Sequence, residues 1–296
     1  MIETWQQPLP HGITLSCRGA GQRGRPVLVF LHGFPEAAFV WDELLAYFAQ
    51  PEHGGYRCVA PNLRGFERST QPSGVSAYRP KHLVQDIAAL IAIEGGQLAC
   101  LVAHDWGGAV AWNLANQLPQ LTKKLAIINS PHPGTFLREL QSNPRQQQAS
   151  AYMNFLIRPD AEQLLREDDY RRLFGFFTSW GGAAWLTEPV RQQYRDVWDA
   201  SLNGGLNYYR ASPLRPPRPE DPGAAGVTLP REMLTVDIPT LVLWAMENVA
   251  LPPELIDGLD DYVADLRLEK VPGATHWIIH ERPAFVAERI GAFLAQ

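Results

Sequence analysis

Several classes of protein are excluded by what this chain of 296 residues lacks. Its three cysteines, Cys17, Cys58 and Cys100, are too few and too scattered for a disulfide framework or a zinc site. There are 26 Lys and Arg against 31 Asp and Glu, so the net charge is −5. A mildly acidic chain lacks the excess of positive charge that binding to nucleic acid or to an anionic membrane surface requires.

Long apolar runs are also missing. No run approaches the ~20 residues that cross a bilayer. The first residues, MIETWQQPLPHG, lack the cationic start and the apolar stretch of a secretory signal. We therefore expect a cytoplasmic protein with no membrane partner.

The sequence does contain short apolar runs, rich in Val, Leu and Ile, that alternate with helical patterns. They predict strands at residues 27–32, 57–60, 98–104, 125–129, 240–245 and 266–271. Residues 109–118 and 283–294 carry apolar side chains at helical spacing. Strands buried on both faces have this composition, and the intervening lengths suit the crossovers of a parallel sheet. We therefore predict an α/β fold.

The composition changes between the predicted strand 125–129 and the predicted strand 240–245. From 133 to 230, aromatic and charged residues dominate, with helical periodicity and no strand-like runs. The stretch closes with SPLRPPRPEDPGAAGVTLP, whose prolines exclude regular helix and interior strand. This pattern predicts a helical cap (133–230) inserted into a core formed by 1–132 and 231–296. A cap over the carboxyl edge of the sheet would cover the ligand site.

The most informative segment is the turn that follows the predicted strand 98–104, which reads AHDWGG. It has the small-x-nucleophile-x-small form of a nucleophile elbow, with Asp105 at the nucleophile position. Small residues are required there because the turn is sharp and the strand and helix pass close together. The helix N-terminus favours the ionised carboxylate. Asp105 is alternatively an ordinary helix N-cap.

Two further loops favour the nucleophile. His32 and Phe34 belong to HGFP, which follows the strand 27–32 where such a fold completes an oxyanion hole, so the N–H groups of Phe34 and Trp106 are candidate donors. His276 belongs to GATHW, between a predicted strand and a predicted helix, and is the candidate base.

Together, these segments resemble the epoxide hydrolases of the α/β-hydrolase fold. The resemblance is carried by HGFPE, RGFERS, HDWGG, INSPHP and HW, and it spans nearly the whole chain. It implies that Asp105 attacks an epoxide carbon and that water activated by His276 then hydrolyses the ester to a diol. A carboxylate is a competent nucleophile at a saturated carbon, and its ester can later be cut.

The resemblance also implies two cap tyrosines that donate to the epoxide oxygen. Asn207-Tyr208-Tyr209-Arg210 is similar to the N-[aromatic]-Y-R motif of the family and places the second tyrosine at Tyr209. Tyr152, in SAYMNF, lies where the first is expected, although its surroundings match less well. Phenols are neutral near pH 7 and able to donate, but tyrosines in an aromatic-rich insertion also serve simply in packing.

The expected triad acid is missing. The family pattern after strand 240–245 places Asn248 at the acid position, beside Glu247, and the alternative acid position of the family holds Asn129. Either Glu247 reaches His276 after a one-residue shift, or Asn248 holds the histidine without offering charge, or the chain is a variant impaired in ester hydrolysis. We expect Asn248→Asp to speed turnover.

Other functions remain open at this point. A haloalkane or haloacetate dehalogenase would use the same Asp105, and the indole of Trp106 suits a halide. However, Phe34 replaces the usual second halide donor, and Trp106 replaces the arginine that would hold a carboxylate. A non-catalytic binding protein is a further alternative, supported by the two asparagines.

The expected site is a mainly apolar pocket with His32, Phe34, Trp106 and Trp277 contacting a small apolar epoxide or halogenated substrate. Other cap aromatics are candidates for it or for the cap core: Phe155, Phe176, Phe177, Trp180 and Trp185. We expect no cofactor and no metal, and a monomer or homodimer. Glu67 is interpreted as a solvated loop residue, His132 as a structural residue at the cap entry, and His280 as lacking functional partners.

Overall fold

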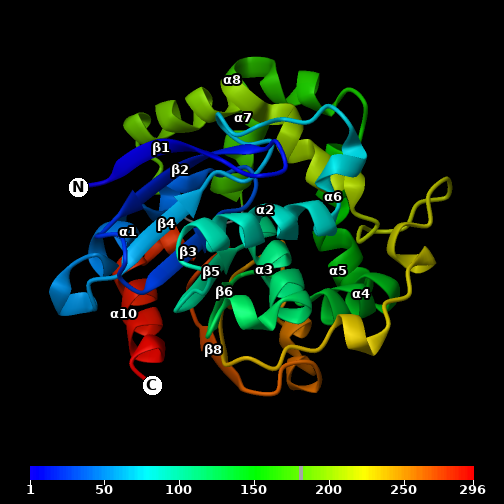
Figure 1. The fold of residues 1–296 in the computed structure, drawn as a ribbon. Coiled ribbons are helices and arrows are strands. Elements are labelled where there is room, and N and C mark those ends of the chain that lie inside the picture. The colour runs from blue at the N-terminus through cyan, green and yellow to red at the C-terminus, as the bar shows by residue number, and fades with distance from the viewer. Residues whose placement is uncertain (180–182) are drawn as a thin grey trace.

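A computed structural model describes residues 1–179 and 183–296, and its centre is one eight-stranded sheet (Figure 1). The strand order is β1-β2-β4-β3-β5-β6-β7-β8. The first two strands are antiparallel to their neighbours, and the others run parallel. The strand bounds are β1 Glu3–Pro8, β2 Thr14–Ala20, β3 Val27–Leu31, β4 Arg57–Pro61, β5 Cys100–His104, β6 Leu125–Ile128, β7 Thr240–Ala245 and β8 Leu266–Val271.

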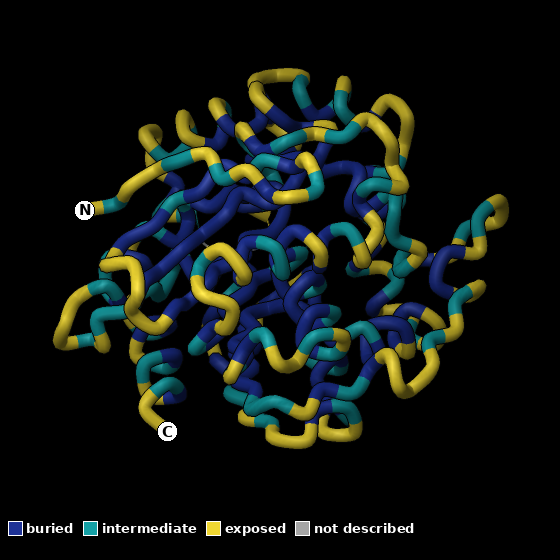
Figure 2. Tube along the Cα trace, viewed as in Figure 1, coloured by how far each residue is buried: buried dark blue, intermediate teal, exposed yellow. Residues whose placement is uncertain are grey.

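All six predicted strands are present, which confirms the α/β prediction. Every residue of β3, β4, β5, β6 and β7 is buried, as expected of parallel strands covered on both faces (Figure 2). The antiparallel pair β1 and β2 was not predicted. Its outer strand reads ETWQQP and is largely exposed, so no apolar run marks it.

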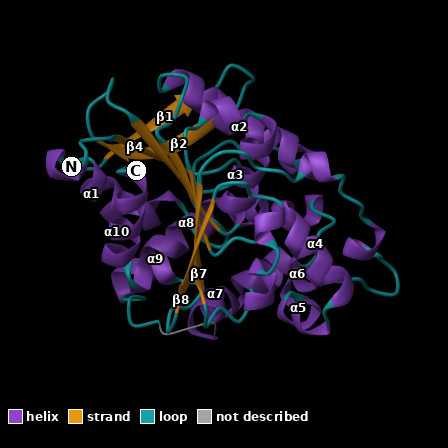
Figure 3. Cartoon of the chain, turned by 90° about the horizontal axis from the view of Figure 1, so that it is seen from below, coloured by secondary structure: helices purple, strands orange, loops and turns teal. Residues whose placement is uncertain are grey.

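Helices cover both faces of the sheet (Figure 3). One face carries α1 and α10, which pack together with α9 near them, and the other carries α2 and α3. Their bounds are α1 Asp42–Phe48, α2 Pro80–Ile93, α3 Trp106–Gln117, α9 Ile278–Glu281 and α10 Pro283–Leu294. The predicted range of the last helix is confirmed residue for residue. Among the described residues, no helix is both long and apolar enough to cross a membrane.

Between β6 and β7 the chain leaves the sheet and forms a group of helices. These are α4 Pro133–Ser142, α5 Pro144–Ala149, α6 Ala151–Leu156, α7 Ala161–Ser179 and α8 Glu188–Ala211. The described part of 133–230 contains no strand, and its proline-rich end is irregular except for the short turn Gly223–Gly226. Trp180 lies outside the described residues.

His132 lies where the chain enters this helical group. Its ring accepts a hydrogen bond from the N–H of Gly134 and lies 2.8 Å from the carbonyl of Leu234, where the chain returns to the sheet. Burial lowers the pKa of His132 to about 4, so the ring is neutral at pH 7. The ring joins the two ends of the insertion, which agrees with a structural role.

Candidate active site

Asp105 lies at the turn between β5 and α3. Its backbone has φ 49° and ψ −121°, which is a strained conformation for a residue with a side chain. Ser130 supports the turn because its hydroxyl donates to the carbonyl of Asp105 at 2.6 Å. The conformation is that of a nucleophile elbow, which exposes one side chain at the carboxyl edge of the sheet.

Three glycines make room for this turn. A Cβ on Gly107 would overlap with the backbone of Leu31, and a Cβ on Gly108 would overlap with the side chain of Ser130. A Cβ on Gly33 would overlap with the carboxyl group of Asp105 itself. The small residues seen in the sequence are therefore required by close approach of backbone and side chains.

The carboxylate of Asp105 is held by backbone donors. The N–H of Phe34 donates to Oδ1 at 2.8 Å, and the N–H of Trp106 also bonds the carboxylate. Burial raises the pKa of Asp105 above its ordinary value, and these two N–H groups, with His104, oppose the rise. The two predicted oxyanion donors thus contact the Asp105 carboxylate directly.

His276 faces the other oxygen of the same carboxylate. Its Nε2 lies 3.8 Å from Oδ2 of Asp105, and the side chain is 2% exposed. Burial, with the neighbouring His104, lowers the pKa of His276 well below 6.5, although Glu36 opposes this. The imidazole is therefore neutral at pH 7.

Asn248 contacts the far side of the imidazole. Its Nδ2 lies 3.0 Å from Nδ1 of His276, and its Oδ1 accepts hydrogen bonds from the N–H groups of Ala250 and Leu251 at 3.2 and 3.1 Å. Glu247 is exposed, and its backbone N–H bonds the carbonyl of Ala274. This arrangement contradicts the account in which a loop shift brings Glu247 to His276.

The second acid position is also an amide. The Nδ2 of Asn129 donates to the carbonyls of Thr275 and His276, and its Oδ1 accepts from the N–H of Ala245 at 2.8 Å. Asn129 is thus bonded to backbone and fastens the histidine loop to β7. Neither expected acid position places a carboxylate against the imidazole.

The two candidate tyrosines approach Asp105 from the helical insertion. Tyr209 lies on α8 and packs edge-on against Trp106, with ring centroids 5.0 Å apart. Tyr152 lies on α6, with its ring centroid 6.1 Å from that of Tyr209, and the two hydroxyl groups interact. Burial and the charge of Asp105 raise the pKa of both phenols, so both are protonated at pH 7.

A cavity of about 70 Å³ lies between Asp105 and these tyrosines. Trp106 lines it, and its other walls are mainly apolar: Ala109, Pro131, Phe136, Met153, Leu214 and Leu251. The small volume and the apolar walls suit a slender, weakly polar ligand.

Of the four predicted substrate-binding residues, only Trp106 lines this cavity, and His32, Phe34 and Trp277 do not. His32 is fully buried, with Nδ1 2.9 Å from the carbonyl of Gly33 and Nε2 accepting from the N–H of Leu63. Trp277 is fully buried against Phe177, with ring centroids 4.6 Å apart. Both residues neighbour motif residues in the sequence, yet their side chains do not reach the cavity. Phe34 contributes its N–H, while its ring packs against Tyr209.

The sequence analysis did not predict a buried polar cluster around Glu36, which lies next to the site. The carboxylate of Glu36 contacts Nδ1 of His104 at 3.1 Å, Nε2 of His280 at 2.7 Å and the hydroxyl of Tyr194 at 3.2 Å. The Nε2 of His104 lies 3.0 Å from the carbonyl of His276. The expectation that His280 lacks partners was therefore wrong. No local signal reveals the cluster, since 244 positions separate Glu36 from His280.

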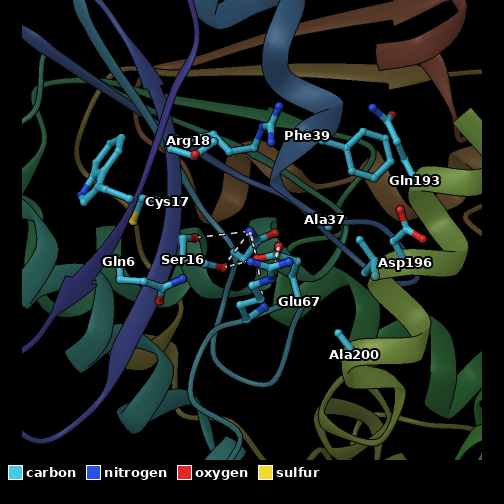
Figure 4. Close-up of a pocket in the computed structure, with 15 residues that line it drawn as sticks. Gln6, Ser16, Cys17, Arg18, Ala37, Phe39, Glu67, Gln193, Asp196 and Ala200 are labelled. Carbon is cyan, nitrogen blue, oxygen red and sulfur yellow. Dashed lines mark hydrogen bonds and ion pairs between the residues drawn. The ribbon is translucent and has the colours of Figure 1, made fainter. Parts of the chain in front are cut away.

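A second, larger cavity of about 580 Å³ lies away from Asp105, between β1, β2 and α8 (Figure 4). At its floor Glu67 accepts hydrogen bonds from Ser16 at 2.5 Å and Asn62 at 3.2 Å. Glu67 is half-buried with φ 49°, so it is not the solvated loop residue expected from the sequence. The two cavities share no lining residue, and the described residues contain no cluster of metal-ligating side chains.

Comparison with known proteins gives a consistent result. Residues 26–283 match the family described as alpha/beta hydrolase fold. "AB hydrolase superfamily protein YfhM" of Bacillus subtilis (strain 168) is 34% identical over 287 residues, covering 96% of this chain and 95% of that protein. "Epoxide hydrolase 4" of Mus musculus is 31% identical over 295 residues, covering 96% and 77%.

Solved structures agree with these sequence relatives. An epoxide hydrolase from Bacillus megaterium, crystallised with an inhibitor, has a TM-score of 0.88 at 29% identity and covers 99% of this chain and 100% of that one. An epoxide hydrolase from metagenomes of hot environments has a TM-score of 0.87 at 36% identity, covering 99% of both chains. The chain therefore belongs to the α/β-hydrolase fold family and, within it, to the group that contains the epoxide hydrolases.

Proposed function

We propose that this protein opens epoxides through a covalent ester on Asp105. The observation that carries the proposal is that one partly buried carboxylate faces two protonated phenols across a small, mainly apolar cavity. A carboxylate can attack a saturated carbon, and a phenol can donate to the oxygen that leaves it. The core comprises 1–132 and 231–296, and the helical cap comprises 133–230.

In the first step, an oxygen of Asp105 attacks an epoxide carbon from the side opposite the ring oxygen. A carbon–oxygen bond forms to the carboxylate, the ring carbon–oxygen bond breaks, and its electron pair stays on the former ring oxygen. Tyr209 and Tyr152 donate to this oxygen and supply its proton, because an alkoxide is a stronger base than a phenolate.

In the second step, water attacks the carboxyl carbon of the ester. His276 accepts a proton from this water, and the N–H groups of Phe34 and Trp106 stabilise the negative charge that develops on the carboxyl oxygen. Collapse of the intermediate breaks its bond to the diol oxygen, which takes the proton of the new carboxylic acid, so the diol leaves and the Asp105 carboxylate is regenerated. The proton held by His276 passes to the tyrosinate left by the first step. Asn248 contacts Nδ1 of the imidazole in this scheme, whereas exposed Glu247 takes no part.

The substrate is a small apolar epoxide, since the cavity is narrow and mainly apolar. Water is the second substrate, and the protein acts in the cytoplasm as a monomer or homodimer without a cofactor. The pair of phenols favours an epoxide over a haloalkane, because a departing halide needs no proton. It also argues against a purely binding role, which requires no donors facing a nucleophile.

The test is a substrate panel of small epoxides, with styrene oxide as the reference, and small haloalkanes and haloacetates. We expect consumption of epoxide, no release of halide, and no reaction with an Asp105→Ala variant. Halide release from the haloalkanes without epoxide consumption would identify a dehalogenase instead. Failure of every compound to react, even with Asn248→Asp, would favour a binding protein.

A further inference from the structure

The orientation of the Asn248 amide is fixed by the loop that carries it. Its oxygen accepts the N–H groups of Ala250 and Leu251, so its NH₂ group must point toward Nδ1 of His276. The reversed amide would place NH₂ against two N–H donors and lose both hydrogen bonds. Asn248 is 4% exposed, so water does not readily replace those bonds.

This orientation also fixes the proton on the imidazole. An NH₂ group only donates, so Nδ1 of His276 has to be the acceptor of their 3.0 Å contact. A neutral imidazole carries one proton, which then lies on Nε2, the nitrogen 3.8 Å from Asp105. The ring nitrogen that carries hydrogen has its lone pair in the aromatic system, so Nε2 in this tautomer cannot accept a proton from water.

We propose that this chain forms the Asp105 ester much faster than it hydrolyses it, because the Asn248 amide holds His276 mainly in the tautomer that cannot activate water. This inference rests on the proposed function, since it needs the ester on Asp105 to form. Alkylation needs only the Asp105 carboxylate and a proton donor for the ring oxygen, so it proceeds. Hydrolysis of the ester, the second step of the proposed function, needs an unprotonated Nε2, so it proceeds only through the minor tautomer and is slow.

The loop itself is compatible with a working acid. An aspartate at position 248 would keep one oxygen on the Ala250 and Leu251 N–H groups and present the other to Nδ1 as an acceptor. The proton of the imidazole would then move to Nδ1 and free Nε2. In a serine-protease triad, replacing the corresponding aspartate by asparagine lowers turnover about 10⁴-fold because the histidine takes the wrong tautomer.

The experiment mixes the protein with excess styrene oxide and follows diol release and intact mass together. We expect one equivalent of epoxide to be consumed rapidly, an adduct on nearly every chain, and very slow diol release afterwards. Asn248→Asp should form the same adduct at a similar rate and release diol about 10⁴-fold faster. Gln117→Glu, which makes the same amide-to-carboxylate change at an exposed position of α3, should behave like the unaltered chain.

A second measurement needs no variant. Nitrogen-15 NMR of the unaltered chain with labelled histidine should find the proton of His276 on Nε2, assigned by loss of its signals in His276→Gln. A proton on Nδ1 would overturn the inference, as would steady diol release without adduct or loss of hydrolysis in Glu247→Gln. No adduct and no epoxide consumption, in the unaltered chain and in Asn248→Asp, would instead overturn the proposed function.

Discussion

Gly33 lies so close to Asp105 that a single added carbon would collide with the aspartate side chain. The overlap of a Cβ on Gly33 falls on Cβ, Cγ and Oδ1 of Asp105, that is, on its side chain rather than on backbone. Its neighbour Phe34 supplies the N–H that holds Oδ1 at 2.8 Å. The loop after β3 and the elbow after β5 therefore fix the carboxylate together.

We predict that Gly33→Ala lowers the rate of Asp105 alkylation by at least about 10²-fold, because a displacement near 1 Å misplaces the attacking oxygen. The free energy of unfolding should fall by about 1–3 kcal/mol, as for other overpacked sites. Adduct formation by mass spectrometry and urea unfolding measure the two effects. Gly175→Ala in α7, where an added Cβ meets nothing within 4 Å, is the matched control. An unchanged alkylation rate in Gly33→Ala would contradict the assignment of Asp105.

Tyr209→Phe removes one of the two proposed donors to the epoxide oxygen. We expect alkylation to slow about 10²-fold, the effect of losing one donor to a developing oxyanion. Tyr208→Phe is the control, because its hydroxyl instead donates to the carbonyl of Arg64 at 2.9 Å. The single-turnover rate of adduct formation distinguishes the variants. Equal rates in both would remove Tyr209 from the mechanism.

Glu36 should make the stability of the protein depend on pH. Burial acts to raise its pKa, but hydrogen bonds from His104 and His280 outweigh burial and hold the pKa below its usual range. A carboxyl group whose pKa is lower in the folded than in the unfolded protein stabilises the folded state at pH above its unfolded pKa, near 4.3. This stabilisation is lost as the pH falls toward the pKa of the folded state.

We therefore predict that Glu36→Gln lowers the free energy of unfolding by about 3–5 kcal/mol near pH 6, since it leaves buried partners uncompensated. The difference from the unaltered chain should shrink as pH falls below about 4. Urea unfolding across pH 3–7 measures this, with exposed Glu43→Gln as the control. A difference that does not vary with pH would show that Glu36 contributes through packing alone.

The features that could be predicted from sequence are those encoded locally. The apolar runs of β3 to β8 and the helical spacing of α10 are patterns within a few consecutive residues, and they suffice to predict these elements. The elbow at Asp105 could also be recognised, because the strand, the small residues and the helix follow one another directly. The β1–β2 pair escaped because its outer strand is polar and exposed.

The contacts between distant segments could not be predicted. Glu36 and His280 meet only because the sheet brings the loop after β3 beside α9. The direction of the Asn248 amide depends on two backbone N–H groups whose positions follow from the folded loop. The sequence alone showed that asparagine stands at the acid position. It could not show on which nitrogen of His276 the proton lies.

The proposed function depends most directly on a covalent bond between an oxygen of Asp105 and a carbon of the substrate. Rapid chemical quench after mixing with styrene oxide, followed by digestion and peptide mass mapping, locates this bond. We predict that the added mass appears on the peptide containing Asp105, persists in the unaltered chain and is short-lived in Asn248→Asp. Conversion of the epoxide by the unaltered chain without any added mass on that peptide would contradict the account.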